Sequence, residues 1–175
     1  MIERGKAKTM ERKPIRQRPH RLPREDYCGE VTVVFTICVT ENQPLFHEGE
    51  VVKTFIDILR KTMDEHDCQV IIYCFMPDHI HLILQGLSPN ADAWKAVVNF
   101  KQQSGYWLHQ NRNQFHWQKG FFDHVIRRSE DLESQIRYIA QNPIRSGLAH
   151  NWGEYPHTGS LGIDLEVVMN GLSEM

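Results

Sequence analysis

The sequence predicts an α+β fold, in which helices cover an antiparallel sheet, and three observations carry this prediction. Several short segments are rich in β-branched, aromatic and aliphatic residues, which is the composition of strands. Other segments place apolar residues at the three- to four-residue spacing of amphipathic helices. Along the chain these segments follow the order β-α-β-β-α-β and then one more helix. That order predicts a ferredoxin-like sandwich extended by a carboxy-terminal helix.

The first half of this order is expected between residues 31 and 85. Residues 31–40, VTVVFTICVT, suit a strand buried on at least one face. Residues 50–66 suit a helix, because apolar residues from Val51 to Met63 recur at helical spacing with charges between them. Two further strands are expected at residues 70–76 and 79–85. Only Pro77 and Asp78 separate them, and this pair favours the tight turn of a hairpin.

The second half begins with an amphipathic helix at residues 91–111, with Gly105 as a weak point, and continues with a short strand at residues 121–127. The last helix is expected at residues 129–142. Acidic residues in its first turn suit the positive end of the helix dipole, and Pro143 is a stop signal directly after it.

Length and composition indicate one domain. The chain has 175 residues, of which 41% are hydrophobic, enough for a core of its own. No stretch approaches the roughly 18 apolar residues of a membrane span, and the charged amino terminus lacks the apolar stretch of a signal peptide. We therefore expect a cytoplasmic protein without membrane contacts. The four cysteines match neither a CxxC zinc motif nor a compact disulfide framework, so we expect reduced thiols that pack as small hydrophobes.

Charge separates an amino-terminal arm from the rest of the chain. The net charge is −2, yet residues 1–26 hold nine Lys and Arg against four Asp and Glu. Such a segment, with three prolines and few apolar residues, is typical of disorder. It either contacts DNA phosphates or only keeps the protein in solution. The domain itself is expected at residues 27–155, and residues 156–175 are left as a tail without a clear pattern.

A candidate metal site lies in the second strand of the hairpin, at His79 and His81. Side chains in a strand alternate between faces, so these imidazoles point the same way while Ile80 and Leu82 point to the other face. Two imidazoles on one face can share a metal ion. An arbitrary HxH pair is more often a pair of exposed polar positions, so the motif needs a partner elsewhere in the chain.

That partner is expected on the helix at residues 129–142. Tyr138 and Asn142 are four residues apart and therefore share a face, away from the apolar face of the same helix. An amide oxygen there can complete a metal site while the phenol points at a metal-bound substrate. Alone, this spacing is more typical of a surface pair.

Several motifs in a fixed order resemble the REP-associated tyrosine transposases, a branch of the HUH single-strand nucleases, where U is a hydrophobic residue. The motifs are residues 75–82 (FMPDHIHL), Trp117-Gln118, residues 122–127 (FDHVIR) and residues 138–148 (YIAQNPIRSGL). The resemblance spans about residues 31–155. The basic arm and the final residues lie outside it.

The resemblance implies a function for each part of the site. His79, His81 and Asn142 would bind a divalent ion, Mg²⁺ or Mn²⁺, although zinc, nickel or copper would compete on affinity alone. Tyr138 would be the nucleophile that cleaves single-stranded DNA and forms a 5′-phosphotyrosine. A phenol is mostly protonated near neutral pH, so attack needs positioning and a proton acceptor, which the sequence does not identify.

The DNA contacts are expected around the same residues. Arg127, Arg128 and Arg145 flank the site and can hold phosphates, and His124 falls within one of the family-like motifs. Aromatic residues that can stack on unpaired bases, or equally belong to a core, are Trp117, Phe121 and Phe122. A second metal site formed by His109, His116 and His124 is not expected, because their spacing fits neither one helix face nor one strand.

The sequence thus predicts a metal-dependent nuclease and strand transferase that recognises hairpin DNA and cleaves beside it. The alternative is a domesticated protein that binds hairpins and has lost turnover, against which the intact His79, His81 and Tyr138 argue. A phosphoesterase for small substrates would need additional carboxylates for a two-metal site. The REP-associated branch is expected to act as a monomer, whereas related HUH transposases are often dimers.

Overall fold

Five antiparallel strands form one sheet in the computed structural model, which describes residues 22–172. The order of the strands across the sheet is β4-β1-β3-β2-β5. The four strands β4-β1-β3-β2 have the order of a ferredoxin-like sheet, so this prediction is confirmed, and β5 adds a strand beside β2. The strands are β1 (Thr32–Cys38), β2 (Cys68–Met76), β3 (His79–Gly86), β4 (Phe122–Ile126) and β5 (Thr158–Leu161).

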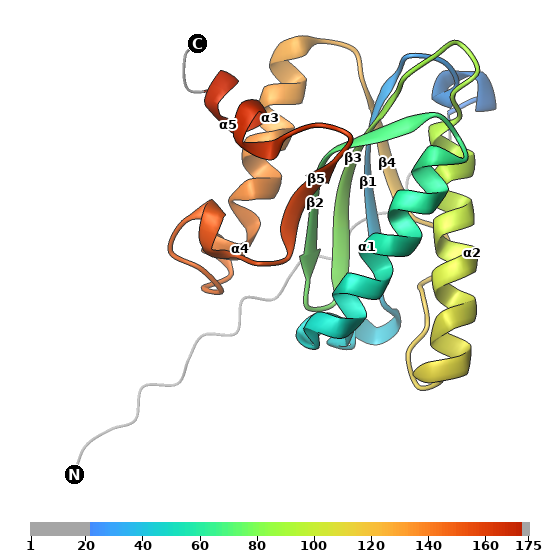
Figure 1. Cartoon of the computed structure of the whole chain (residues 1–175), viewed down its shortest axis with the longest axis vertical. Coiled ribbons are helices and arrows are strands. Elements are labelled where there is room, and N and C mark those ends of the chain that lie inside the picture. Colours follow the sequence, from blue (N-terminus) through green and yellow to red (C-terminus); the bar gives the residue numbers. More distant parts are fainter. Residues whose placement is uncertain (1–21, 173–175) are drawn as a thin grey trace.

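Helices cover both faces of the sheet. Figure 1 shows α1 and α2 on one side of the strands and α3, α4 and α5 on the other. These helices are α1 (Gly49–Asp64), α2 (Ala93–Asn111), α3 (Ser129–Ala140), α4 (Asn142–Arg145) and α5 (Leu165–Gly171). Short 3-10 turns lie in the connections, at η1 (Arg24–Tyr27), η2 (Thr40–Asn42), η3 (Leu45–His47) and η4 (Trp152–Glu154).

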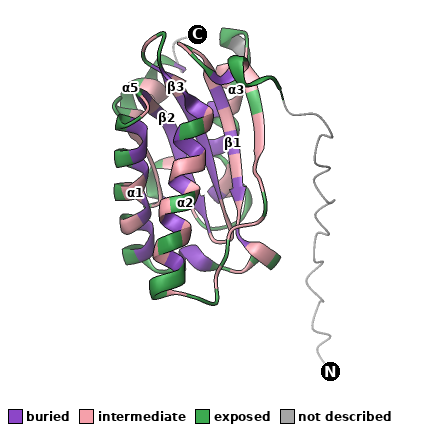
Figure 2. Ribbon diagram, turned by 90° about the vertical axis from the view of Figure 1, so that its right-hand side faces the viewer, coloured by how far each residue is buried: buried purple, intermediate pink, exposed green. Residues whose placement is uncertain are grey.

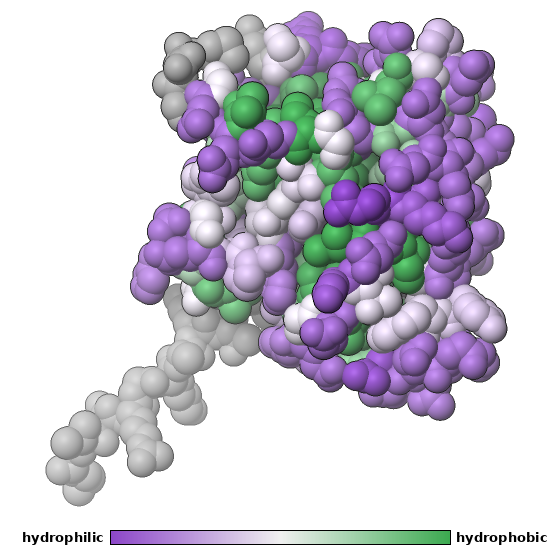
Figure 3. Space-filling view, viewed as in Figure 1, coloured by the Kyte–Doolittle hydropathy of each residue, from purple (hydrophilic) through white to green (hydrophobic). Residues whose placement is uncertain are grey.

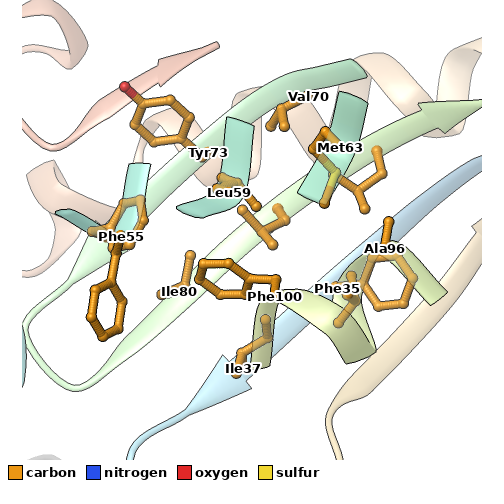
Figure 4. Packing of buried hydrophobic residues seen from close by; sticks show 14 of the residues in the cluster. Phe35, Ile37, Phe55, Leu59, Met63, Val70, Tyr73, Ile80, Ala96 and Phe100 are labelled. Atoms are coloured by element: carbon orange, nitrogen blue, oxygen red, sulfur yellow. The ribbon is translucent and has the colours of Figure 1, made fainter. Parts of the chain in front are cut away.

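The larger hydrophobic core lies between the sheet and the pair α1 and α2. Strand β1 alternates strictly between half-buried and buried residues, so Val33, Phe35 and Ile37 enter this core and Thr36 faces the other way. Leu59 of α1 and Phe100 of α2 are buried against the same side of the sheet (Figure 4). Figure 2 shows the buried stripe of each helix turned toward the sheet and the exposed stripe turned to solvent.

A second, smaller core forms on the opposite face, under α3. Ile136 and Ile139 of α3 pack against Ile72 and Cys74 of β2 and Ile83 of β3. A shift in the pairing of β2 with β3, between Val70 and Ile72, marks an irregularity at this point of the ladder. This core holds α3 over the face to which His79 and His81 point.

The last residues of the chain add to both faces. Residues 158–171, which the sequence analysis left in a patternless tail, contain β5 and α5. Leu161 of β5 is buried in the first core, and Leu172 after α5 is buried in the second. A strand of four residues and a helix of seven are too short to show a periodicity in the sequence. Strand β5 is therefore recognised by its pairing with β2 and not by its sequence pattern. Figure 3 shows hydrophobic surface near α5, where Val167 is exposed.

The amino-terminal segment is tied to α2. Arg24 pairs with Asp92, which accepts two hydrogen bonds from the guanidinium at 3.2 and 2.7 Å. Asp92 also caps α2, because its Oδ1 accepts the backbone N–H of Lys95 at 2.9 Å. Most of the predicted basic arm, residues 1–21, lies outside the described residues.

The helix expected at residues 129–142 is divided into two. Helix α3 ends at Ala140, and Pro143 lies in the first turn of α4, where its fixed φ and its missing N–H are tolerated. Pro143 therefore follows the end of α3 and lies in the first turn of α4. Asn142 is the first residue of α4. Within the described range, no helix has the length and apolar character needed to cross a bilayer.

Candidate metal and tyrosine site

His79 and His81 form a pair on β3, and their ring nitrogens converge. The hairpin turn at Pro77 and Asp78 starts β3, so both histidines lie near one end of the sheet. Their Nε2 atoms are 3.1 Å apart and their rings are nearly perpendicular. His81 is buried and His79 is half-buried. The alternation of β3 therefore places both imidazoles as the sequence predicts, on the face opposite the buried Ile80 and Leu82.

The other nitrogen of each ring is held by a neighbour. Asp78 Oδ1 lies 2.5 Å from His79 Nδ1, and an ionised carboxylate only accepts, so His79 carries a proton on Nδ1. Thr36 Oγ1 lies 2.9 Å from His81 Nδ1 and can accept a proton from it in the same way. When both Nδ1 atoms carry the proton, the lone pairs of the two Nε2 atoms face each other, which is the tautomer that a shared cation requires; otherwise one Nε2–H donates to the other Nε2.

This arrangement fits a divalent cation. Two lone pairs turned toward each other repel, and a cation between them removes the repulsion. Two nitrogens about 2.1 Å from an octahedral ion, at right angles, lie roughly 3.0 Å apart, close to the observed separation. Among residues 22–172, no group of three or more His, Cys, Asp or Glu side chains could hold a metal ion. A third protein ligand would thus have to be of another type.

Cys74 lies beside His81 in the ladder but is not suited to be that ligand. It pairs with His81 in the register of β2 and β3 and is buried in the second core. Burial raises the pKa of the Cys74 thiol to about 11, although a hydrogen bond with Thr158 opposes this shift. The thiol therefore stays protonated and packs as a small hydrophobe, in agreement with its strand-like surroundings in the sequence.

Tyr138 lies over the histidine pair. Its ring centroid is 6.1 Å from that of His81, and the residue is 47% exposed, so a substrate can reach the phenol. Its helix positions it there because Ile136 and Ile139, on either side in the sequence, are buried in the second core. The apolar face of α3 thus sets the direction in which Tyr138 points.

The four other tyrosines of the chain are placed differently. Tyr27 donates to Asp123, and Tyr73 packs on Phe75 in the first core. Tyr155 is buried and donates to the carbonyl of Phe75, and burial raises its pKa to about 12. Tyr106 is exposed on α2, which covers the opposite face of the sheet.

Asn142 is close to Tyr138 but its amide is turned to the backbone. Its Nδ2 donates to the carbonyl oxygen of Tyr138 at 3.1 Å. The division between α3 and α4 keeps the two residues one turn apart, as expected. The remaining atom of the amide, Oδ1, is of the type that Mg²⁺ and Mn²⁺ bind.

Arg145 contacts Tyr138 twice. Its guanidinium carbon lies 4.2 Å from the centroid of the phenol ring, and NH2 donates to the Tyr138 carbonyl at 2.9 Å. The sequence analysis expected Arg145 to hold DNA phosphates. The structure places it as a support for the aromatic ring, with its charge still exposed.

The other expected DNA contacts are divided between two regions. Arg127 and Arg128 are exposed between β4 and α3, and His124 is exposed on β4. Trp117 is not brought to the site. Its ring packs among Phe46, Phe55 and Phe100 in the first core and its Nε1 donates to Ser104.

Thr36 is the site residue that the sequence analysis did not single out. It is the polar residue at an alternate position of an otherwise apolar strand, on the face opposite Phe35 and Ile37. Its role depends on the pairing of β1 with β3, which puts Thr36 directly beside His81. The alternation marks the residue, but only strand pairing shows its partner.

A ferredoxin-like sheet that presents two histidines of an HxH motif to a tyrosine on a covering helix has the architecture of a single-tyrosine DNA-cleaving transposase. Residues 30–142 match the family model described as "Transposase IS200 like". The chain belongs to this transposase family, whose tyrosine transposases are DNA-cleaving enzymes.

Two individual proteins are similar to this chain. A Haemophilus influenzae protein described as a REP-associated tyrosine transposase is 26% identical over 147 residues, which are 77% of this chain and 82% of that protein. The solved structure of a REP-associated tyrosine transposase bound to a REP hairpin has a TM-score of 0.68 and 19% identity. It covers 81% of this chain and 82% of its own chain. This second likeness shows that the fold is shared.

Proposed function

We propose that the protein is a metal-dependent endonuclease and strand transferase that binds REP-like hairpin DNA and cleaves the adjoining single strand through Tyr138. The observation that carries the proposal is the contact of the Tyr138 ring with His81, whose Nε2 converges with that of His79. A likeness to a protein solved with a REP hairpin supports the choice of substrate.

His79, His81 and the amide oxygen of Asn142 would hold Mg²⁺ or Mn²⁺. When bound, the ion would neutralise the negative charge of the scissile phosphate, which otherwise repels a nucleophile. Asp78 and Thr36 keep the two imidazoles in the tautomer and orientation that binding requires. Arg127 and Arg128, exposed between β4 and α3, would hold phosphates farther along the bound DNA.

Tyr138 would perform the chemical step. Its phenolic oxygen forms a bond to phosphorus and loses its proton, while the bond from phosphorus to the 3′ oxygen breaks. The products are a 5′-phosphotyrosine and a free 3′-hydroxyl. Since the phosphodiester energy is conserved, attack by another 3′-hydroxyl reverses the step and joins a new strand. One residue therefore serves cleavage and rejoining.

The test compares covalent capture of DNA by the wild type and by the Tyr138→Phe variant. The wild type is expected to form a protein–DNA adduct with hairpin oligonucleotides that carry a single-stranded flank, in Mn²⁺ or Mg²⁺, and chelation with EDTA should abolish it. Tyr138→Phe should form none, because the ring remains but the nucleophilic oxygen is gone, and hairpin affinity should be unchanged. The measurement is a gel shift that survives denaturation.

Tyr106→Phe is the matched control, because it removes the same atom from an exposed tyrosine on the other face. It should leave the adduct yield at the wild-type level. An undiminished adduct with Tyr138→Phe would exclude Tyr138 as the nucleophile. Hairpin binding by a wild type that forms no adduct would favour the alternative, a domesticated binding protein.

We further propose that the protein acts as a monomer. Tyr138 and His81 of the same chain are in ring contact, so one chain holds both the histidine pair and the nucleophile. A partner subunit is not required to complete the site.

A further inference from the structure

Beside the histidine pair, the same face of the sheet continues onto the edge strand β4. Thr36 of β1 lies between His81 on one side and Phe122 on the other in the two ladders. Residues directly opposite each other in antiparallel strands point to the same face. Neighbouring strands are about 4.8 Å apart, so Phe122 lies roughly 10 Å across the sheet from His81. His124 follows two residues later, opposite Val34, on the same face.

Phe122 is an aromatic residue that does not pack in either hydrophobic core of the described chain. It is half-buried, and within the described part of the chain it is included in neither of the two hydrophobic cores and in no aromatic pair. Its neighbour Phe121 is different, because it packs on Phe35 and Trp94 on the opposite face. His124, the next residue on the face of Phe122, is exposed.

The charges around this surface suit a nucleic acid. The carboxylate of β4, Asp123, points to the other face and accepts a hydrogen bond from Tyr27 at 2.6 Å. The strand is followed directly by Arg127 and Arg128, which are both exposed. An aromatic ring and an imidazole on a strand that leads to two exposed arginines offer stacking to bases and charge to phosphates, which is the combination used to bind single strands.

We propose that Phe122 and His124 form a platform on which unpaired bases next to the scissile phosphate stack. This proposal rests on the proposed function, since the histidine pair and Tyr138 define where the phosphate lies. We expect the occupant to be a single strand. Strand β4 lies at the edge of the sheet and its opposite face is covered, so only the face of Phe122 is open, and an unpaired base can stack on that aromatic surface. The platform accepts any base, because every base has a flat face.

The test compares bases with an abasic backbone. Binding of fluorescent oligo(dT) of about 12 nucleotides, and of an abasic oligomer of equal length, is measured in the full-length Tyr138→Phe background. Phe122→Ala should weaken oligo(dT) binding about ten-fold and leave the abasic oligomer unchanged. Phe122→Trp should retain affinity. Phe122→Leu, apolar but without a π face, should behave like Phe122→Ala. His124→Ala should give a smaller loss in the same direction.

Tyr106→Ala removes an exposed aromatic from the opposite side of the molecule and should change neither affinity. Equal oligo(dT) affinity in Phe122→Ala and its parent, or equal losses on both oligomers, would overturn the platform. Thermal denaturation of each variant shows whether a loss of affinity comes from a folding defect. Such a defect would lower the melting temperature, whereas loss of the stacking surface would not. Adduct formation by the wild type is measured separately. An absent adduct overturns the proposed cleavage, while unchanged oligo(dT) binding beside a normal adduct overturns the platform alone.

Discussion

Tyr138 is exposed, yet its ring is held in place by one residue from the next helix. Arg145 stacks on the ring and donates to the carbonyl of the same residue, and Asn142 donates to that carbonyl as well. A nucleophile held in one orientation loses less entropy when the reaction begins. The exposure that lets DNA approach is therefore combined with a restraint on the side chain that attacks.

Removing this restraint should slow cleavage. We expect Arg145→Ala to lower the single-turnover rate of adduct formation about ten-fold, because a stacked cation and a hydrogen bond are each worth about 1 kcal/mol. Arg145→Lys keeps the charge without the planar stack and should give an intermediate rate. Arg112→Ala, which breaks a pair with Glu48 elsewhere, should not change it. A loss of hairpin affinity at an unchanged rate would instead assign Arg145 to phosphate binding.

At the scale of elements, Asp92 joins the start of α2 to the amino-terminal segment. Burial opposes ionisation of this carboxyl, but hydrogen bonds from the Lys95 N–H and from Arg24, with both positive charges, outweigh it and lower the pKa of Asp92. A carboxyl whose pKa is lower in the folded state stabilises the fold above its unfolded pKa, about 4, and loses this contribution as pH falls through its folded pKa.

We expect Asp92→Ala to lower the free energy of unfolding by about 1 kcal/mol at neutral pH, mainly through loss of the α2 cap. Asp92→Asn retains a capping side chain and should cost less. The difference between the wild type and either variant should shrink as pH falls below about 4, where the carboxyl of the unfolded chain becomes protonated while that of the folded chain is still ionised. Urea denaturation from pH 7 to pH 3 measures this. Asp57→Ala, at an exposed position of α1, is the control, and a pH-independent difference would contradict the assignment.

Strand β5 extends the sheet beyond the four strands that the sequence predicts. It pairs with β2 through residues around Gly159, and a Cβ at that glycine would lie 2.4 Å from the hydroxyl oxygen of Tyr73. The lack of a side chain lets the strand approach the tyrosine ring. The strand is thus fitted to its neighbour, although its own sequence carries no strand-like pattern.

If β5 is part of the fold, its core residue should contribute to stability. We expect Leu161→Ala to lower the free energy of unfolding by about 2 to 3 kcal/mol, since the side chain is 7% exposed. Leu87→Ala makes the same change at a residue that is 51% exposed and should cost less than about 0.5 kcal/mol. Similar urea midpoints for both variants would show that β5 is dispensable.

At the scale of the whole molecule, both cores serve the site. The first core fixes the sheet and the second fixes α3 on it, so Tyr138 approaches its own histidines across one intramolecular interface. This interface depends on residues of a single chain.

A mixing experiment tests whether the site is complete in one chain. An equimolar mixture of His81→Ala and Tyr138→Phe is expected to form no adduct, because neither chain holds both groups. A tyrosine acting at the histidines of a second chain would restore adduct formation in the mixture. Light scattering should give the mass of one chain, 20.5 kDa, for the wild type alone, and the mass of one chain plus one hairpin when the hairpin is bound.

The sequence by itself determined features that belong to one element at a time. The alternation of β3 separates His79 and His81 from the buried Ile80, and the apolar spacing of α3 leaves Tyr138 outside the core. The order of the elements predicted the sheet. Each of these follows from a local period, which the side chains of one strand or helix display without reference to any other.

Only the tertiary structure decided which elements meet. Thr36 reaches His81 across 45 residues of sequence, and Phe121 and Phe122 divide between two faces that the sequence did not distinguish. Trp117 enters the core although it belongs to a family-like motif. The physical reason is that a period shows which face of an element is apolar, while the partner of that face is selected by packing and strand pairing between distant segments.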